Sequence, residues 1–165
     1  MKTPRRALLL AAMGAGLPLG YLALQSAAVP VVDMVLLDGS RHKPVDFEGR
    51  VTLVNFWATS CSVCVAEMPA MAETYQHFRG RGFSVVAVAM QHDAPSRVVH
   101  FVQSRALPFP VAIDNTGAVA RAWGDVALTP TSFLVNQSGK VIKRYQGAPN
   151  FAELRALIEA TLAQG

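Results

Sequence analysis

The chain has 165 residues, 52% of them hydrophobic, and a formal net charge of +4. This length suits one domain with a short appendage, and the apolar fraction is ample for one packed core. Lys2, Arg5 and Arg6 supply three of the positive charges, and from residue 7 onward 12 Lys or Arg stand against 11 Asp or Glu. The body of the chain is therefore nearly neutral, so its charge indicates no nucleic-acid partner.

The N-terminus has the pattern of an export sequence. Three cations precede an uncharged stretch that is most apolar from Ala7 to Leu24, and a basic start with an apolar middle is typical of such sequences. Two interpretations stay open. Residues 1–28 are either cleaved off after Ala28, with the small Ser26 at the third position before the cut, or kept as a membrane anchor. We favour the anchor, although its apolar part is at the short end of the roughly 17–25 residues that a span needs.

In both cases the basic residues hold the N-terminus in the cytoplasm and direct the rest of the chain across the membrane. We therefore expect one domain, residues 29–165, on the periplasmic or extracytoplasmic side of the bacterial inner membrane. The chain has only two cysteines, Cys61 and Cys64. Because such compartments oxidise thiols, a closely spaced pair there needs a redox explanation.

The rest of the chain alternates between apolar runs typical of buried strands and stretches with apolar residues at helical spacing. In chain order we expect short strands at Val35–Leu37 and Val45–Phe47, a strand at Val51–Trp57, a helix at Cys61–Arg79, a strand at Phe83–Met90, a helix with Asp93 as its N-cap, a strand at Phe109–Ile113, a short helix at Gly117–Trp123, a hairpin of Ser132–Asn136 and Lys140–Tyr145, and a helix that Asn150 caps. Strands and helices alternate through most of the chain, and a β-hairpin comes near its end. This order predicts an α/β fold, with a mixed central sheet flanked by helices on both faces.

Cys61 and Cys64 follow the predicted strand Val51–Trp57 and open the next helix. Free backbone N–H groups and the helix dipole favour negative charge at a helix start, so we expect a Cys61 thiolate with a pKa below that of a free cysteine. Cys64 lies one turn deeper and can attack a mixed disulfide held at Cys61. The pair therefore predicts thiol–disulfide exchange, with Cys61 as the nucleophile and Cys64 as the resolving thiol.

Two other interpretations of the pair are weaker. A structural disulfide between residues three apart closes a very short loop, so it removes little entropy from the unfolded chain. A closed zinc site needs further ligands, and the four histidines form no spaced ligand pair; they are His42, His77, His92 and His100. We therefore expect no metal.

Glu67 and Pro130 each have a functional and an ordinary interpretation. Glu67 falls three residues after Cys64 on nearly the same helix face, where a carboxylate can accept a thiol proton and burial would raise its pKa. It is equally an ordinary glutamate facing water. Pro130 precedes a predicted strand, a place for a tight and in some cases cis turn, although a routine strand-edge proline is commoner.

The run VNFWATSCSVCVAEMP, residues 54–69, together with TPTSFL, residues 129–134, resembles the membrane-anchored, thioredoxin-like TlpA/ResA family. The resemblance covers roughly residues 33–164. It implies a thioredoxin fold with an N-terminal β-hairpin and an inserted strand–helix element.

The same resemblance implies roles for particular residues. Cys61 and Cys64 would be the redox pair and Glu67 the active-site glutamate. Pro130 would be a cis-proline facing the disulfide, where the adjoining backbone pairs with a substrate strand; Trp57 and Thr129 would also contribute to substrate binding. The Cys61–Cys64 disulfide would act without a cofactor.

Members of this family commonly act as reductants outside the cytoplasm. The resemblance implies apocytochrome c or a copper-site protein as substrate and a membrane thiol transporter as electron donor. Two alternatives stay open. Thiolates suit Cu(I), so Cys61, Cys64 and a histidine could form a copper-handling site. An oxidant or isomerase of the same fold would differ only in potential and partner.

The chain departs from the common family pattern at three places. Ser60 stands where many relatives carry a second tryptophan, which bears on how a partner docks beside Cys61. Asn55 stands where thioredoxin carries a buried aspartate, so proton handling would rest more on Glu67. Ser62 and Val63 replace the frequent proline-containing pairs between the cysteines, a place that tunes potential and thiol pKa.

Overall fold

The computed structural model describes residues 27–165. The predicted export segment 1–28 lies outside this range apart from its last two residues, so both interpretations of it stay predictions. Among the described residues, no helix has the length and apolar character needed to cross a membrane.

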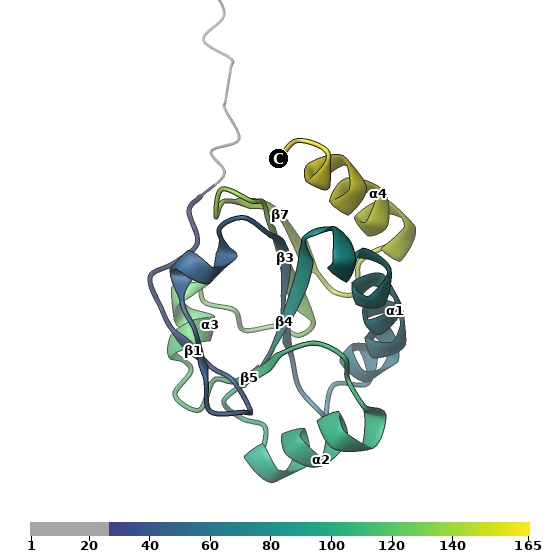
Figure 1. Ribbon diagram of the computed structural model, residues 1–165. Coiled ribbons are helices and arrows are strands. Elements are labelled where there is room, and N and C mark those ends of the chain that lie inside the picture. The colour runs from purple at the N-terminus through teal and green to yellow at the C-terminus, as the bar shows by residue number, and fades with distance from the viewer. Residues whose placement is uncertain (1–26) are drawn as a thin grey trace, which may run out of the picture.

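A five-stranded mixed sheet forms the centre of the domain (Figure 1). The strands lie in the order β5-β4-β3-β6-β7, with β3, β4 and β5 parallel and β6 and β7 antiparallel to their neighbours. Their bounds are Val51–Trp57 for β3, Phe83–Ala89 for β4, Val111–Ile113 for β5, Thr131–Val135 for β6 and Val141–Gln146 for β7. Two further short strands, β1 (Met34–Val35) and β2 (Arg41–His42), form a separate hairpin.

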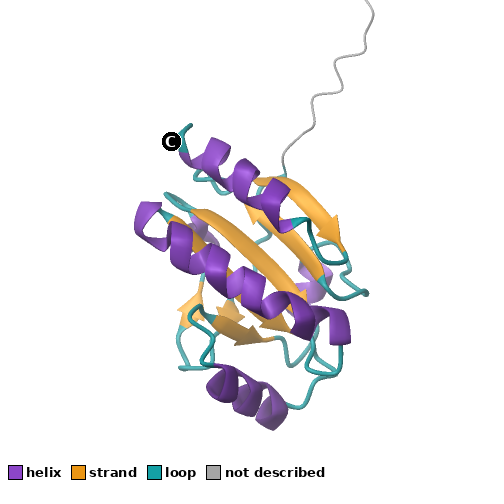
Figure 2. Cartoon of the chain, turned by 90° about the vertical axis from the view of Figure 1, so that its right-hand side faces the viewer, coloured by secondary structure: helices purple, strands orange, loops and turns teal. Residues whose placement is uncertain are grey.

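Helices cover both faces of the sheet. They are α1 (Ser62–Phe78), α2 (Pro95–Arg105), α3 (Ala118–Ala122) and α4 (Phe151–Leu162), with two 3-10 turns at Pro44–Phe47 and Arg79–Arg81. The helices α1 and α4 lie side by side against one face (Figures 1 and 2), and α3 lies on the other face with the N-terminal hairpin. Between α2 and β6 the chain has a further strand and a short helix, β5 and α3, and the strand–helix insertion that the resemblance implies stays a prediction.

Alternate side chains of β3 divide the core in two, because successive residues of a strand point to opposite faces. Leu53 and Trp57 pack against α1 and α4, and Val54 and Phe56 pack on the other face, around Trp123. The β-branched, apolar run of β3 thus fills both layers, as expected for a central strand.

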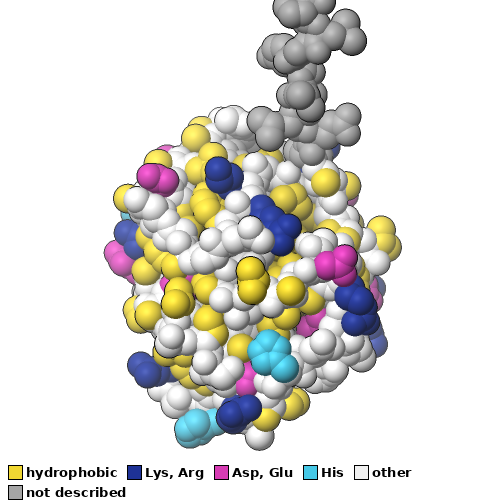
Figure 3. All heavy atoms as spheres, turned by 180° about the vertical axis from the view of Figure 1, so that it is seen from behind, with side chains coloured by type: hydrophobic (Ala, Val, Ile, Leu, Met, Phe, Trp, Pro, Cys, Tyr) yellow, Lys and Arg dark blue, Asp and Glu magenta, His cyan; other side chains and the backbone are white. Residues whose placement is uncertain are grey.

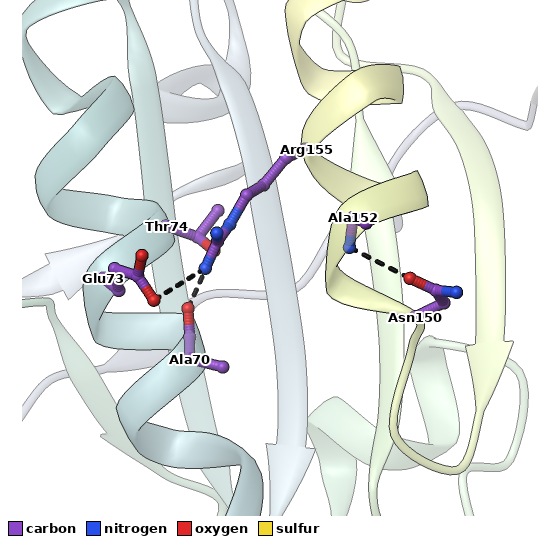
Figure 4. A network of polar contacts seen from close by, with 6 residues as sticks. All are labelled: Ala70, Glu73, Thr74, Asn150, Ala152 and Arg155. Carbon is purple, nitrogen blue, oxygen red and sulfur yellow. Dashed lines mark hydrogen bonds and ion pairs between the residues drawn. The ribbon is translucent and has the colours of Figure 1, made fainter.

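Polar contacts tie α4 to α1 and fix where α4 begins (Figure 4). The Arg155 guanidinium donates to Glu73 at 2.9 Å and to the Thr74 hydroxyl at 2.9 Å. Asn150 caps α4 as predicted, since its side-chain oxygen accepts from the backbone N–H groups of Ala152 at 3.0 Å and Glu153 at 3.3 Å. Such caps satisfy donors that a helix start leaves free.

The predicted order of elements is confirmed. The first N-terminal strand is Met34–Val35 and not Val35–Leu37, and two further corrections lie near prolines. The second N-terminal strand is Arg41–His42, and Val45–Phe47 lies in a 3-10 turn that Pro44 opens, because proline has no N–H for a strand ladder and its ring fixes φ near a helical value. The strand predicted from Phe109 begins only at Val111, after Pro110.

Candidate active site

The Cys61–Cys64 pair lies at the carboxyl end of β3, where α1 begins. The two residues form a disulfide. Cys61 is the N-cap of α1, and its Sγ accepts the backbone N–H of Cys64 at 3.1 Å. Cys61 is half-buried and Cys64 is fully buried. A partner can therefore reach Cys61 from outside, and the N–H at Sγ is placed to stabilise a thiolate there.

The segment before β6 meets the disulfide from the other side. Because β6 runs antiparallel to β3, with Thr131 opposite Phe56, the residues just before β6 lie at the same end of the sheet as Cys61. The Thr129–Pro130 peptide bond is cis, and the Thr129 carbonyl oxygen lies 3.6 Å from the Cys61 Sγ. Pro130 is buried and Thr129 half-buried.

Glu67 is buried in the protein rather than facing water. It lies three residues after Cys64 in α1, and only 5% of its surface is exposed. Its Oε1 accepts a 2.9 Å hydrogen bond from the Asn55 amide, which also donates to the Ser132 hydroxyl at 2.9 Å. Within residues 27–165 the second oxygen, Oε2, has no hydrogen-bond partner.

Burial sets the protonation of Glu67. Desolvation raises its pKa to about 7, and the hydrogen bond from Asn55 opposes this rise. A carboxyl group with a pKa near the working pH can both accept and return a proton. Asn55, which stands where thioredoxin carries an acid, here serves as a neutral donor to Glu67, so Glu67 is the only carboxyl group in this hydrogen-bonded set of three.

Trp57 lies inside the core and not at the surface of the site. Its side chain is fully buried, and its ring contacts Phe101 with centroids 5.2 Å apart. The predicted part of Trp57 in substrate binding stays a prediction.

Asp93 is a site residue that sequence reasoning placed wrongly. The N-cap of α2 is Ala94, and the fully buried carboxylate of Asp93 instead accepts from the backbone N–H and, at 2.7 Å, from the hydroxyl of Thr59. Arg97 lies 3.8 Å from the same carboxylate. Asp93 thus holds the loop that leads to Cys61, and only its position just after β4, next to β3 in the sheet, could have indicated this.

Two exposed apolar side chains flank the disulfide. Val63, between the cysteines, is 50% exposed, and Leu128, before Thr129, is 68% exposed. Val63 stood out in the sequence only for its place between the cysteines, and Leu128 did not stand out, because isolated apolar residues at the surface are common.

The described part of the chain contains no group of three or more His, Cys, Asp or Glu side chains arranged to hold a metal ion. The copper alternative therefore gains no third ligand from residues 27–165.

Comparison with known proteins places this site in a family. The profile of the Redoxin family matches residues 24–158. The chain belongs to the Redoxin family. Among this redoxin's relatives is the thiol-disulfide oxidoreductase ResA of Bacillus thuringiensis, 35% identical over 123 residues that cover 74% of this chain and 70% of the relative. The ResA of Geobacillus thermodenitrificans is 32% identical over 165 residues, 97% of this chain and 94% of the relative.

Solved structures agree with this redoxin's fold. A Neisseria meningitidis protein described as a thioredoxin superposes with a TM-score of 0.78 at 35% identity, covering 83% of this chain and 91% of that one. A thioredoxin-family thiol:disulfide interchange protein from Chlorobium tepidum gives 0.75 at 26% identity, covering 84% and 97%. The thioredoxin fold and the ResA resemblance are therefore confirmed, and this redoxin is a thiol–disulfide oxidoreductase.

Proposed function

We propose that this redoxin reduces protein disulfides on the extracytoplasmic side of the membrane, with Cys61 as nucleophile, Cys64 as resolving thiol and Glu67 as proton acceptor. The observation that carries the proposal is the buried Glu67, one turn beyond the buried Cys64, with a pKa of about 7. A buried thiol cannot give its proton to water directly, so it needs a base at this place.

The reaction begins with the reduced pair. The Cys61 thiolate attacks one sulfur of the substrate disulfide, a mixed disulfide forms, and the other substrate sulfur leaves as a thiolate. Cys64 then gives its proton to Glu67, and the Cys64 thiolate attacks the Cys61 Sγ. The Cys61–Cys64 disulfide forms, the second substrate thiolate leaves, and two electrons have passed from the pair to the substrate.

The surface around Cys61 supports an extended polypeptide as the substrate. The Thr129 carbonyl beside the Cys61 Sγ is a backbone acceptor at the mouth of the site, and backbone groups of this kind pair with an added strand. The exposed side chains of Val63, between the cysteines, and Leu128, next to Thr129 in the chain, offer apolar contacts. In this proposal Thr129 and the adjoining Pro130 align the substrate so that its disulfide meets the Cys61 Sγ.

The family resemblance supplies the candidates for substrate, donor and place. We propose apocytochrome c or a copper-site protein as the substrate, a membrane thiol transporter as the electron donor, and attachment to the bacterial inner membrane through the N-terminal segment. No cofactor enters the reaction beyond the Cys61–Cys64 disulfide.

Trapping the mixed disulfide tests the assignment of roles. In Cys64→Ala, Cys61 can still attack a substrate disulfide, but no resolving thiol remains to break the mixed disulfide that forms. We therefore expect a stable covalent adduct with a disulfide-containing peptide, visible by mass spectrometry. Cys61→Ser serves as the matched variant and is expected to form none. An adduct through Cys64 in the Cys61→Ser protein, or full disulfide reduction by that protein, would overturn the assignment.

A further inference from the structure

A groove lies between the loop before Cys61 and the helix α2. It has a volume of about 370 Å³, and its lining includes Thr59 and Ser60 on the loop and Arg97, His100 and Arg105 on α2. Ser60 is the residue next to Cys61 in the chain. Its side chain is small and exposed, so the groove opens directly beside the half-buried nucleophile.

The charge of this groove is positive. Arg97, His100 and Arg105 all line the groove, and all three are exposed. The sequence of α2 contains no Asp or Glu. Asp93 offsets part of the charge of Arg97 from 3.8 Å, and this leaves Arg105 without an acidic partner among the groove's lining residues.

The groove continues into an apolar hollow between α1 and α2. This hollow has a volume of about 200 Å³ and includes Val65, Met68 and Leu107. Phe101 and Arg105 line both spaces, and the Arg105 guanidinium lies 5.7 Å from the centre of the Phe101 ring. A ligand held beside Cys61 can therefore contact cations in the groove and apolar side chains in the hollow.

We propose that this groove binds an acidic segment of the protein substrate, with carboxylates a few residues from its reactive cysteine and an apolar side chain beyond them. The inference rests on the proposed function and narrows its substrate class. From Arg97 to Arg105 the helix rises about 12 Å, which about four residues of extended chain can span. A segment that starts at the Cys61 Sγ can thus place one or two carboxylates against α2.

Other occupants fit the groove less well. A bilayer surface would contact the exposed cations but would not enter a hollow between two helices. Another copy of this domain offers no acidic surplus, because the body of the chain is nearly neutral. Figure 3 shows histidine and Lys or Arg side chains close together, with an acidic side chain among them, at the lower end of the molecule, the end at which Figure 1 draws α2.

The test uses two cyclic peptides with the same disulfide, one with two glutamates beside a cysteine and one with two glutamines. The rate constant for oxidation of the reduced protein by each peptide is measured by acid quench, alkylation and mass. At low salt we expect the acidic peptide to react about tenfold faster, since complementary charge speeds encounter by this order or more. At high salt the ratio should approach one.

Arg105→Glu is expected to remove the preference for the acidic peptide, and Arg105→Gln to reduce it without reversing a charge. Arg50→Glu makes the same charge change just before β3, at the end of the sheet opposite Cys61, and should keep the preference. Equal rates for both peptides in the unaltered protein would overturn the groove proposal and leave the proposed function standing. If neither peptide oxidised the protein, the proposed function itself would fail.

A last experiment tests binding to anionic vesicles. The protein is sedimented with phosphatidylglycerol vesicles, with and without Arg105→Glu. If the protein bound the vesicles, if Arg105→Glu abolished this binding, and if the two peptides reacted at equal rates, a membrane surface would be the occupant and the peptide proposal would be refuted.

Discussion

The burial of Glu67 predicts how Glu67→Gln changes the pH dependence of stability. In the folded, oxidised protein the pKa of Glu67 is about 7, raised from an ordinary value of 4.5 by desolvation. Folding therefore favours the protonated form, and the folded state is penalised once the carboxyl group ionises. Stability contributed by this group is present below pH 4.5 and is lost as the pH rises to about 7.

The size of the effect follows from the pKa difference. Each pKa unit of difference between the folded and unfolded states corresponds to about 1.36 kcal/mol. With a pKa of about 7 in the folded state and 4.5 in the unfolded state, the unfolding free energy of the unaltered protein falls by about 2.5 kcal/mol between pH 5 and pH 8. A glutamine side chain does not titrate, so the unfolding free energy of Glu67→Gln relative to the unaltered protein should rise by about this amount over the same range. Comparing two pH values cancels any effect of the substitution that does not depend on pH.

Urea unfolding of the oxidised protein at pH 5, 6, 7 and 8 measures this difference. Glu48→Gln is the control, because Glu48 is exposed and its carboxylate stays in water in both states. A pH dependence for Glu67→Gln that matched the unaltered protein to within about 0.5 kcal/mol would refute the reasoning, since Glu67 would then titrate alike in the folded and unfolded chain.

Three further predictions concern the partner of Glu67, the loop before Cys61 and the packing of α4. Asn55→Ala removes the hydrogen bond that opposes the rise in the Glu67 pKa, so the midpoint of the pH–rate profile for mixed-disulfide resolution should move to higher pH; a shift to lower pH would contradict this. Asp93→Asn replaces a charged acceptor of two Thr59 donors and should cost about 2 kcal/mol in urea unfolding, whereas a loss under about 0.5 kcal/mol would count against the role of Asp93. Ile158→Ala truncates a fully buried side chain of α4 and should cost about 2–5 kcal/mol, with unchanged Cys61 alkylation as the check that the site is intact.

The elements that carry the active site could be predicted because local patterns decide them. The apolar, β-branched run before Cys61 forms β3, and the helix start at Cys61 follows from the spacing of apolar residues after it. The cap at Asn150 is likewise a local hydrogen-bond pattern. The two-residue strands of the N-terminal hairpin have too few residues for a period to show, and Pro44 moved the second of them.

The surroundings of the cysteines depend on contacts between distant residues, which a single sequence does not contain. Glu67 could equally have faced water, and it is buried only because α1 packs that face over Asn55 of β3. Asp93 has the sequence context of a helix cap, yet its carboxylate turns to Thr59 because β3 and β4 end side by side. The groove next to Ser60 arises between residues some forty positions apart.

The reduction potential of the Cys61–Cys64 couple tests the central claim most directly. The purified protein is equilibrated with defined thiol–disulfide buffers at pH 7, and the free thiols are alkylated and counted by mass. A protein that reduces disulfides should show a low potential, near the thioredoxin value of about −270 mV. A potential near about −120 mV would make the pair an oxidant and would contradict the proposed direction of electron flow.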